Sequence, residues 1–563
     1  MIRLVSLRLT FLVVAASMAS AQPSVLLDAM SQELNRNFSV LKEKADPPPY
    51  FISYEVTERE LRSVSGVLGA ITASDGEKDR LLDVSVRVGS HKLDNYHRVR
   101  GDRGQFTSGA SITYEDNVNS IKRRLWLETD RAYRTAAERL IRIKTNTQVQ
   151  AAEEDNSDDF STEAPSVDRQ APPKLKFDEA AWSGRIRTLS ARFQHYPSVL
   201  TSHVAVLCQT DTRYFVNTEG SRIEHGRGFA RVVITASARA ADGTDLSAFE
   251  TFEAVDAAGL PDDKAILAAI DRTAGDVAAL LRAPEAEPFV GPAIFSGRAA
   301  GVFFHEIFGH RVEGHRQKDE SEGQTFTKSV GTEVLPDFLS VVFDPTLHKV
   351  GGVDLNGWYD YDDEGVKGQR VTVVDRGVLK TFLMSRSPIR GFDRSNGHGR
   401  RQPGFEVVSR QSNLIVESTN AVTEAALRQM LIGEIKKQNK PYGLYFRDIT
   451  GGFTTTQRTG LQAFKVIPVM VYKVYADGRP DELVRGADIV GTPLASFAKI
   501  LATSDKPEVF NGYCGAESGS VPVSAVSPAI LVSEIEIEKK AKSQDRPPLL
   551  PEPTSMETKG GSQ

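Results

Sequence analysis

A segment without apolar periodicity, residues 151–174, constrains how this chain can fold. It combines Asp, Glu, Ser and Pro and includes an acidic run over residues 153–159. Such a composition buries little apolar surface and is typical of a loop or linker. We therefore predict a disordered insertion at residues 151–174, within an N-terminal domain of residues 22–290.

Helical and strand patterns occur on both sides of this segment. Apolar residues recur at helical spacing in three stretches, residues 25–41, 130–147 and 263–281. Strands are predicted at residues 50–56, 82–88, 202–208, 214–216 and 228–238. The N-terminal domain is therefore expected to mix α and β structure.

From about residue 291 the pattern changes to strands and glycine-marked turns. Residues 371–382 predict a hairpin with residues 375–377 at its tip, and residues 464–475 predict a strand. Ile535 and Ile537 alternate with glutamates, as in a strand exposed at the edge of a sheet. We expect an α+β fold, with a C-terminal domain over residues 291–540 and a disordered tail over residues 541–563.

The first 21 residues have the pattern of a secretory signal peptide. Arg3 and Arg8 give a positive start, residues 9–16 are apolar, and Ala19-Ser-Ala21 is a small-residue cleavage pattern. The apolar run is shorter than the roughly 20 residues that a membrane-spanning helix requires. We expect an exported protein, periplasmic or secreted, without a membrane anchor.

The charge of the chain argues against two classes of partner. The net charge of -5 is small for 563 residues. Neither a basic surface for nucleic acid nor a polybasic segment for a membrane surface is indicated.

The most informative motif for chemistry is His305-Glu-Ile-Phe-Gly-His310. Two imidazoles and a carboxylate are the groups that hold a zinc ion and activate a water. The histidines are five residues apart, which on a regular helix places them about 140° apart. A helix entered at Ser296 is expected to end within the motif, with Gly309 adopting backbone angles that let it open. The alternative is a pair of structural histidines, with Glu306 and His310 on one helical face.

The two cysteines have different surroundings. Cys208 lies in an apolar strand and is typical of a small buried hydrophobic residue. Cys514 lies in a glycine-flanked loop, where its thiolate is a candidate third metal ligand that leaves a fourth position for water. A disulfide between Cys208 and Cys514 is the competing interpretation in an oxidising compartment.

These residues resemble the TldD/PmbA metallopeptidases, also called the modulator of DNA gyrase family. The resemblance is specific from about residue 296 to residue 537 and weaker back to about residue 202. Besides the histidine motif, it rests on Val312-Glu-Gly314, Gly399-Arg-Arg401, Gly451-Gly452, Val484-Arg-Gly-Ala487, Cys514-Gly515 and Ser520-Val-Pro-Val523.

The resemblance implies a zinc peptidase with an N-terminal α/β domain and a β-rich, barrel-like C-terminal domain. It implies His305, His310 and Cys514 as zinc ligands and Glu306 as the catalytic carboxylate, which accepts a proton from the attacking water. It also implies unfolded or extended peptide substrates and a homodimer or a heterodimer with a sister subunit. Because all four residues are present, the chain is similar to the metal-bearing subunit; the alternative is a non-catalytic peptide-binding or assembly subunit.

Three further residues leave their roles open. His315 is a candidate fourth ligand, although a surface or supporting role is favoured. Glu313 could orient a histidine ligand or be a solvated surface carboxylate. His398 either faces the substrate with Arg400 and Arg401 or belongs to a mobile charged loop.

Overall fold

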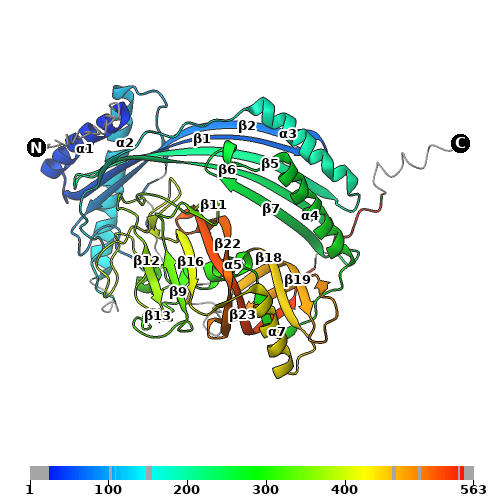
Figure 1. Ribbon diagram of the computed structural model, residues 1–563. Coiled ribbons are helices and arrows are strands. Elements are labelled where there is room, and N and C mark those ends of the chain that lie inside the picture. The colour runs from blue at the N-terminus through cyan, green and yellow to red at the C-terminus, as the bar shows by residue number, and fades with distance from the viewer. Residues whose placement is uncertain are drawn as a thin grey trace, which may run out of the picture.

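The computed structural model describes residues 24–99, 104, 106–107, 109–147, 155–454, 456–458, 464–491, 496–542 and 545–550. The chain forms a mixed α/β N-terminal part and a C-terminal part built on a closed β-barrel (Figure 1). The expected α+β fold with a barrel-like C-terminal domain is confirmed. The predicted signal peptide lies outside the described residues, as do residues 543–544 and 551–563 of the predicted tail.

Long antiparallel strands form an arched sheet in the N-terminal part (Figure 1). Its main strands are β1 (Pro49–Val67), β2 (Ala70–Val88), β5 (Thr201–Asn217), β6 (Arg222–Arg239) and β7 (Asp245–Ala254). The sheet order is β2-β1-β5-β6, with β7 paired to β6. The short strands β3 (Ala110–Ser111) and β4 (Val167–Arg169) pair with β2 and β6.

One face of this sheet is covered by helices. Alternate residues of β5, including Val204, Val206 and Cys208, are buried against α3 (Glu179–Ala191) and α4 (Asp263–Arg282). At the other end of the sheet, α1 (Val25–Lys44) and α2 (Val118–Thr147) pack together and against β1 and β2. Because side chains alternate along a strand, the remaining positions of β5, β6 and β7 face the C-terminal part.

Five strands close into a barrel in the C-terminal part. The ring runs β8-β18-β19-β21-β23 and returns to β8, since β23 (Gly519–Lys539) pairs with both β21 and β8. The other members are β8 (Phe289–Phe295), β18 (Gly443–Thr454), β19 (Phe464–Val474) and β21 (Ala487–Gly491). Ile535 and Ile537 therefore lie in a strand paired on both sides and are buried, so the edge-strand prediction was wrong.

Strand β23 also continues into the rest of the C-terminal sheet. Its first half pairs with β22 (Ile500–Ala516) and β16 (Asn413–Ser418), and β16 leads on to β9 (Leu339–Phe343), β12 (Val371–Asp375) and β13 (Val378–Leu379). The predicted hairpin at residues 371–382 is present as β12 and β13. Helix α5 (Gly297–Ile307) packs on β23, β18 and β22, and α7 (Glu424–Lys437) packs on β8.

The acidic segment is not disordered where the structure describes it. Phe160 is buried, with its ring 4.8 Å from that of Phe51, and the Asp159 carboxylate lies 2.8 Å from His97 Nδ1. Arg394 donates to Glu163 at 2.8 Å. The acidic side chains are paired with distant basic groups, so the disorder prediction fails for residues 155–174; residues 151–154 lie outside the described residues.

Within the described ranges, no helix has the length and apolar character needed to cross a membrane.

Candidate metal centre

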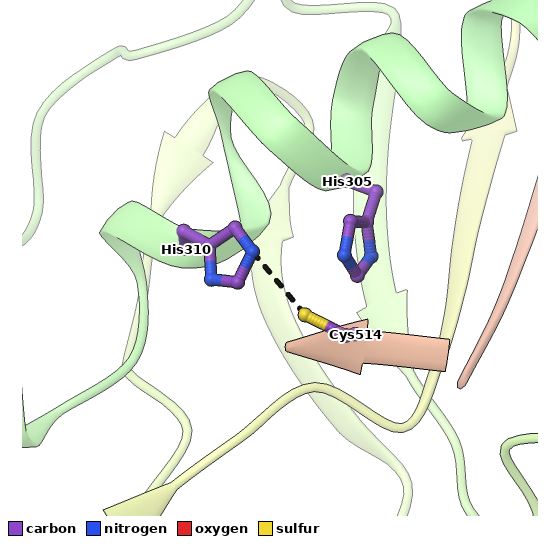
Figure 2. A group of neighbouring side chains, drawn as sticks. All are labelled: His305, His310 and Cys514. Carbon is purple, nitrogen blue, oxygen red and sulfur yellow. Dashed lines mark hydrogen bonds between the residues drawn. The ribbon is translucent and has the colours of Figure 1, made fainter. Parts of the chain in front are cut away.

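The structure brings His305, His310 and Cys514 together (Figure 2). One ligand atom from each side chain lies within 4.8 Å of the other two. His310 Nε2 is 3.3 Å from Cys514 Sγ, and the two imidazole centroids are 5.1 Å apart. All three residues are buried. The three sequence-predicted metal ligands therefore form one compact group of donors.

The end of α5 explains how histidines five residues apart can meet. The helix starts at Ser296, whose side chain accepts from Ala299 N–H, and it ends at Ile307. A 3-10 turn (Gly309–Arg311) then redirects the chain and places His310 beside His305 (Figure 2). The spacing that is wrong for a regular helix is therefore suited to a helix end.

Gly309 is needed here for space and not for an unusual conformation. Its φ is outside the left-handed region, contrary to our expectation that its backbone freedom opens the helix. A Cβ at this position would overlap the side-chain amide of Gln411. Gln411 Nε2 donates to the carbonyl of His305 at 3.2 Å. The close approach of Gln411 to Gly309 therefore stabilises the C-terminal end of α5.

Cys514 comes from β22 and not from a free loop. It is opposite Val521 of β23, and Arg410 Nη2 donates to its carbonyl at 2.6 Å. Cys208, in contrast, lies in the core between the N-terminal sheet and its helices, where burial raises the pKa of its thiol to about 12. The two cysteines are free, and the disulfide interpretation would require the N-terminal core to open.

A buried carboxylate orients His310. Glu313 Oε2 lies 3.2 Å from His310 Nδ1 and accepts from Arg316 Nε at 2.8 Å. Burial alone raises the pKa of the Glu313 carboxyl, but His310 and Arg316 overcome this and hold the pKa at about 2. The ionised carboxylate holds a proton on Nδ1, so Nε2, which faces Cys514, is the ring nitrogen that would bind a metal. Of the two roles left open for Glu313, the structure shows the orienting one.

The electrostatics favour a thiolate. Burial raises the pKa of Cys514, but His310 and His305 more than offset this effect, and the net pKa is well below its usual value. Burial likewise lowers the pKa of His310, whereas Cys514 and Glu313 raise it well above its usual value. A thiolate and two imidazoles are the donors that a borderline-soft divalent ion such as zinc takes. The residues present therefore fit a metal ion.

Glu306 is the fourth predicted residue and lies beside this group. It is partly buried and lines the same cavity as the three ligands. A Cβ on Gly452 of β18 would lie 3.1 Å from Glu306 Cγ, so glycine lets this strand pass close to the carboxylate. Among the described residues, none forms a hydrogen bond or ion pair with Glu306. Its carboxylate is therefore available to the cavity.

The cavity is a large cleft between the two parts of the chain. It has a volume of about 840 Å³. The arched sheet contributes Arg231, Phe249 and Thr251, β18 contributes residues 450–454, and β22 contributes Tyr513 beside Cys514. The sequence did not indicate the sheet residues, because none of them lies in a recognisable motif.

Two other histidines lie outside the donor group. His315 is buried and its Nε2 is hydrogen-bonded to Glu517, so neither a ligand nor a surface role applies. His398 is fully buried, and its Nε2 is 3.1 Å from Ser412 Oγ. Burial lowers the pKa of His398 to about 3 and keeps it neutral. His398 therefore neither faces a substrate nor lies in a mobile loop.

The C-terminal part of the chain matches a known protein family. Residues 290–539 match the family model of the PmbA/TldA metallopeptidase C-terminal domain. These residues form a TldD/PmbA-family domain. The metal-ligand group, Glu306 and the barrel all lie within this TldD/PmbA-family domain.

Curated relatives of the TldD/PmbA-family domain are named as metalloproteases. A metalloprotease from Methanocaldococcus jannaschii is 27% identical over 231 residues, which cover 41% of this chain and 47% of the relative. A metalloprotease TldD homolog from Haemophilus influenzae is 28% identical over 251 residues, covering 44% of this chain and 48% of the relative. The chain thus spans about half the length of the curated relatives it matches.

Solved structures share the whole architecture, beyond the TldD/PmbA-family domain. TldE from Thermococcus kodakarensis superposes with a TM-score of 0.61 at 13% identity, covering 91% of this chain and 100% of that chain. A putative modulator of a DNA gyrase from Thermotoga maritima gives 0.59 at 15% identity, covering 90% and 99%. At these identities the likeness concerns the fold alone.

Proposed function

We propose that this protein is an exported zinc-dependent peptidase that hydrolyses unfolded or extended peptides. The observation that carries this proposal is the buried group of His305, His310 and Cys514 beside Glu306, at the wall of a large cleft. The metalloprotease names of the relatives support it.

The three side chains would hold the ion and leave one coordination position for the reaction. Zinc, when bound, supplies a Lewis acid that polarises a water and the scissile carbonyl. His310 is held for this task by Glu313, and Cys514 is held through its carbonyl by Arg410. Three protein donors are the number typical of a catalytic site, whereas structural zinc sites use four.

Glu306 would move the proton. Its carboxylate lines the same cleft as His305, and it is free to accept a proton from the attacking water. It can then donate this proton to the leaving amine. The pairing of a metal-ligand group with a free carboxylate is the feature that favours hydrolysis over simple metal storage.

The cleft favours an extended substrate. Strand β18 pairs with β8 only over residues 444–446, and beyond them one edge has no ladder partner in the described structure. Gly451 and Gly452 lie in this free part, beside Glu306. An extended peptide could add to this edge and present its backbone to the metal group.

The decisive experiment measures metal content and hydrolysis on the purified protein. We expect one zinc per chain, with Cys514 protected from alkylation until a chelator is added, and cleavage of a library of flexible peptides. Absence of metal together with a non-reactive Cys514 would favour the alternative, a non-catalytic peptide-binding or assembly subunit.

Export and assembly complete the proposal. Export rests on the signal-peptide pattern of residues 1–21, and sequencing the N-terminus of the protein recovered from the producing cell would test it. We also propose a dimer, either of two copies or with a sister chain, which light scattering of the purified protein would test.

A further inference from the structure

A second, smaller cavity lies between the arched sheet and the C-terminal part. Its volume is about 70 Å³, enough for a small ion or a few waters. Aromatic side chains form much of its wall, among them Tyr359, Trp358 and Tyr513. Five arginines also line it, namely Arg59, Arg213, Arg227, Arg400 and Arg401.

Three of these arginines are neutralised by carboxylates. Arg59 Nε is 3.0 Å from Asp211 Oδ1, and Arg401 Nη2 is 2.8 Å from Glu55 Oε2. Arg213 forms ion pairs with Asp363 and Glu55. Asp83 lies 3.9 Å from Arg401 Nη2, so four carboxylates pair with these three arginines and two arginines remain.

Arg227 and Arg400 have no such partner. Arg227 donates to the backbone and side-chain oxygens of Asn356 at 2.7 and 2.6 Å. Arg400, which is 5% exposed, donates to the carbonyls of Gln411 and Pro522 at 2.6 and 2.8 Å. Across the described ranges, neither guanidinium has a carboxylate oxygen within 4.0 Å.

Two buried positive charges in one small cavity destabilise the folded state when no anion lies beside them. Burial lowers the pKa of Arg400 to about 9, and the nearby Arg213 and Arg227 contribute to this shift. Both arginines nevertheless stay protonated at neutral pH, and carbonyl oxygens compensate only part of a buried charge. His225, which also lines the cavity, adds no charge, since burial lowers its pKa to about 4.

The cavity adjoins the metal cleft. Tyr513 lines both spaces and directly precedes Cys514 in β22. Because side chains alternate along a strand, Cys514 points to the metal group while Tyr513 points toward the arched sheet, where its ring lies 6.3 Å from that of Phe229. A peptide in the cleft could therefore place a charged group here while its backbone lies at the metal.

We propose that Arg227 and Arg400 form a subsite for a carboxylate of the peptide substrate. The inference rests on the proposed function, because a carboxylate is the anion that a peptide carries, at its C-terminus or on an Asp or Glu side chain. Guanidinium groups recognise carboxylates through short, charge-assisted hydrogen bonds. The subsite selects acidic or C-terminal segments and sets KM more than kcat.

The first test compares peptides of one sequence in three forms. One has a free C-terminal carboxylate, one is amidated, and one is amidated with an Asp in place of an Asn. We expect KM to be about tenfold lower for a carboxylate form than for the amidated peptide. Whichever carboxylate form binds better identifies the source of the charge. Equal KM values for all three forms would overturn the proposal.

A substitution of Arg227 tests whether the carboxylate preference arises at this cavity. Arg227→Met should raise the KM of the two carboxylate peptides to that of the amidated peptide and so abolish the tenfold difference. Arg227→Lys should keep part of the preference. Arg134→Met, which removes a charge from an exposed ion pair on α2, is the matched control and should keep the full difference. An equal rise of KM for all three peptides in Arg227→Met would contradict the subsite. If Arg227→Met does not fold, the wild-type comparison alone decides.

A second test measures carboxylate binding without peptide hydrolysis. Acetate should raise the melting temperature of the full-length protein relative to acetamide at the same concentration, and Arg227→Met should lose this difference. An acetate effect without peptide cleavage would keep the anion site and reject the peptidase. Cleavage without any carboxylate preference or acetate effect would keep the peptidase and reject the subsite.

Discussion

At the scale of single residues, the proposed function gives Glu306 a part in turnover but none in metal binding. Glu306→Gln keeps the size and polarity of the side chain but cannot accept a proton. We expect kcat to fall by about 10²- to 10⁴-fold, the range for a positioned general base, while the zinc content stays at the wild-type level. Peptide kinetics and elemental analysis of the same preparation check this. Wild-type turnover in Glu306→Gln would mean that another group moves the proton.

Glu313 should act on the metal through His310. In Glu313→Gln, the orienting carboxylate of His310 becomes a neutral amide, and Arg316 and Arg410 lose a buried negative partner. We expect zinc to bind about 10- to 100-fold more weakly, measured by competition with a chromogenic chelator. Glu417→Gln, which alters an exposed ion pair with Arg370, should leave zinc affinity unchanged.

The sequence could identify the candidate metal ligands but not the residues that hold them in place. His305, His310 and Glu306 are adjacent in one motif, and the structure brings Cys514 to them as the family resemblance implied. Glu313 could not be assigned, because its burial depends on Arg410, almost a hundred residues away. Arg227 gave no local signal, and Arg400 was noted only as part of a motif beside His398, since the cavity exists only when the two parts of the chain meet.

At the scale of elements, the end of α5 depends on close contact with Gln411. In Gly309→Ala, the added methyl group overlaps the Gln411 side chain and displaces the turn that carries His310. We expect a loss of about 1–3 kcal/mol in the free energy of unfolding, together with weaker zinc binding. Denaturant titration and metal analysis check both effects.

Gly433→Ala is the matched control for this substitution. Gly433 is an exposed residue of α7, and a Cβ there meets no atom within 4 Å. Alanine should therefore stabilise the helix by roughly 0.5–1 kcal/mol. Equal effects of the two substitutions would show that lack of space beside Gln411 is not the reason why position 309 requires glycine.

Strand positions were easier to predict than strand lengths and pairings. Residues 202–208 and 214–216 were expected as two strands but form the single strand β5, because the polar residues between them stay in the ladder, with Gln209, Asp211 and Arg213 facing the C-terminal part. Ile535 and Ile537 showed the alternation of an edge strand, yet ring closure puts partners on both sides. Alternation reports which face is buried and carries no information on the number of neighbours.

At the scale of the whole molecule, a buried neutral histidine makes the free energy of unfolding depend on pH. The pKa of His398 is about 3 in the folded chain, below the ordinary value of about 6.5 that an unfolded chain has. Between these values the unfolded state binds the extra proton, so the contribution of His398 to stability is lost as pH falls through this window. The expected slope is about 1.4 kcal/mol per pH unit.

The pH dependence of stability that is due to His398 can be measured by comparing the wild type with His398→Gln. The difference in free energy of unfolding between wild type and this variant should be constant above about pH 6.5 and should shift against the wild type as the pH falls toward 4. Denaturant titrations at several pH values give this curve. A difference that does not change with pH would show that the pKa of His398 is the same in the folded and the unfolded chain.

If the protein is a peptidase as proposed, the arched sheet that covers the cleft also limits which proteins it can cleave. The cleft has a volume of about 840 Å³, far less than a folded domain occupies, so a target would first have to expose a stretch of free chain. The cleavage rate of a folded protein would then follow the population of its locally opened state. Such an enzyme would sort the proteins around it by their stability, removing damaged chains while sparing intact neighbours of the same sequence.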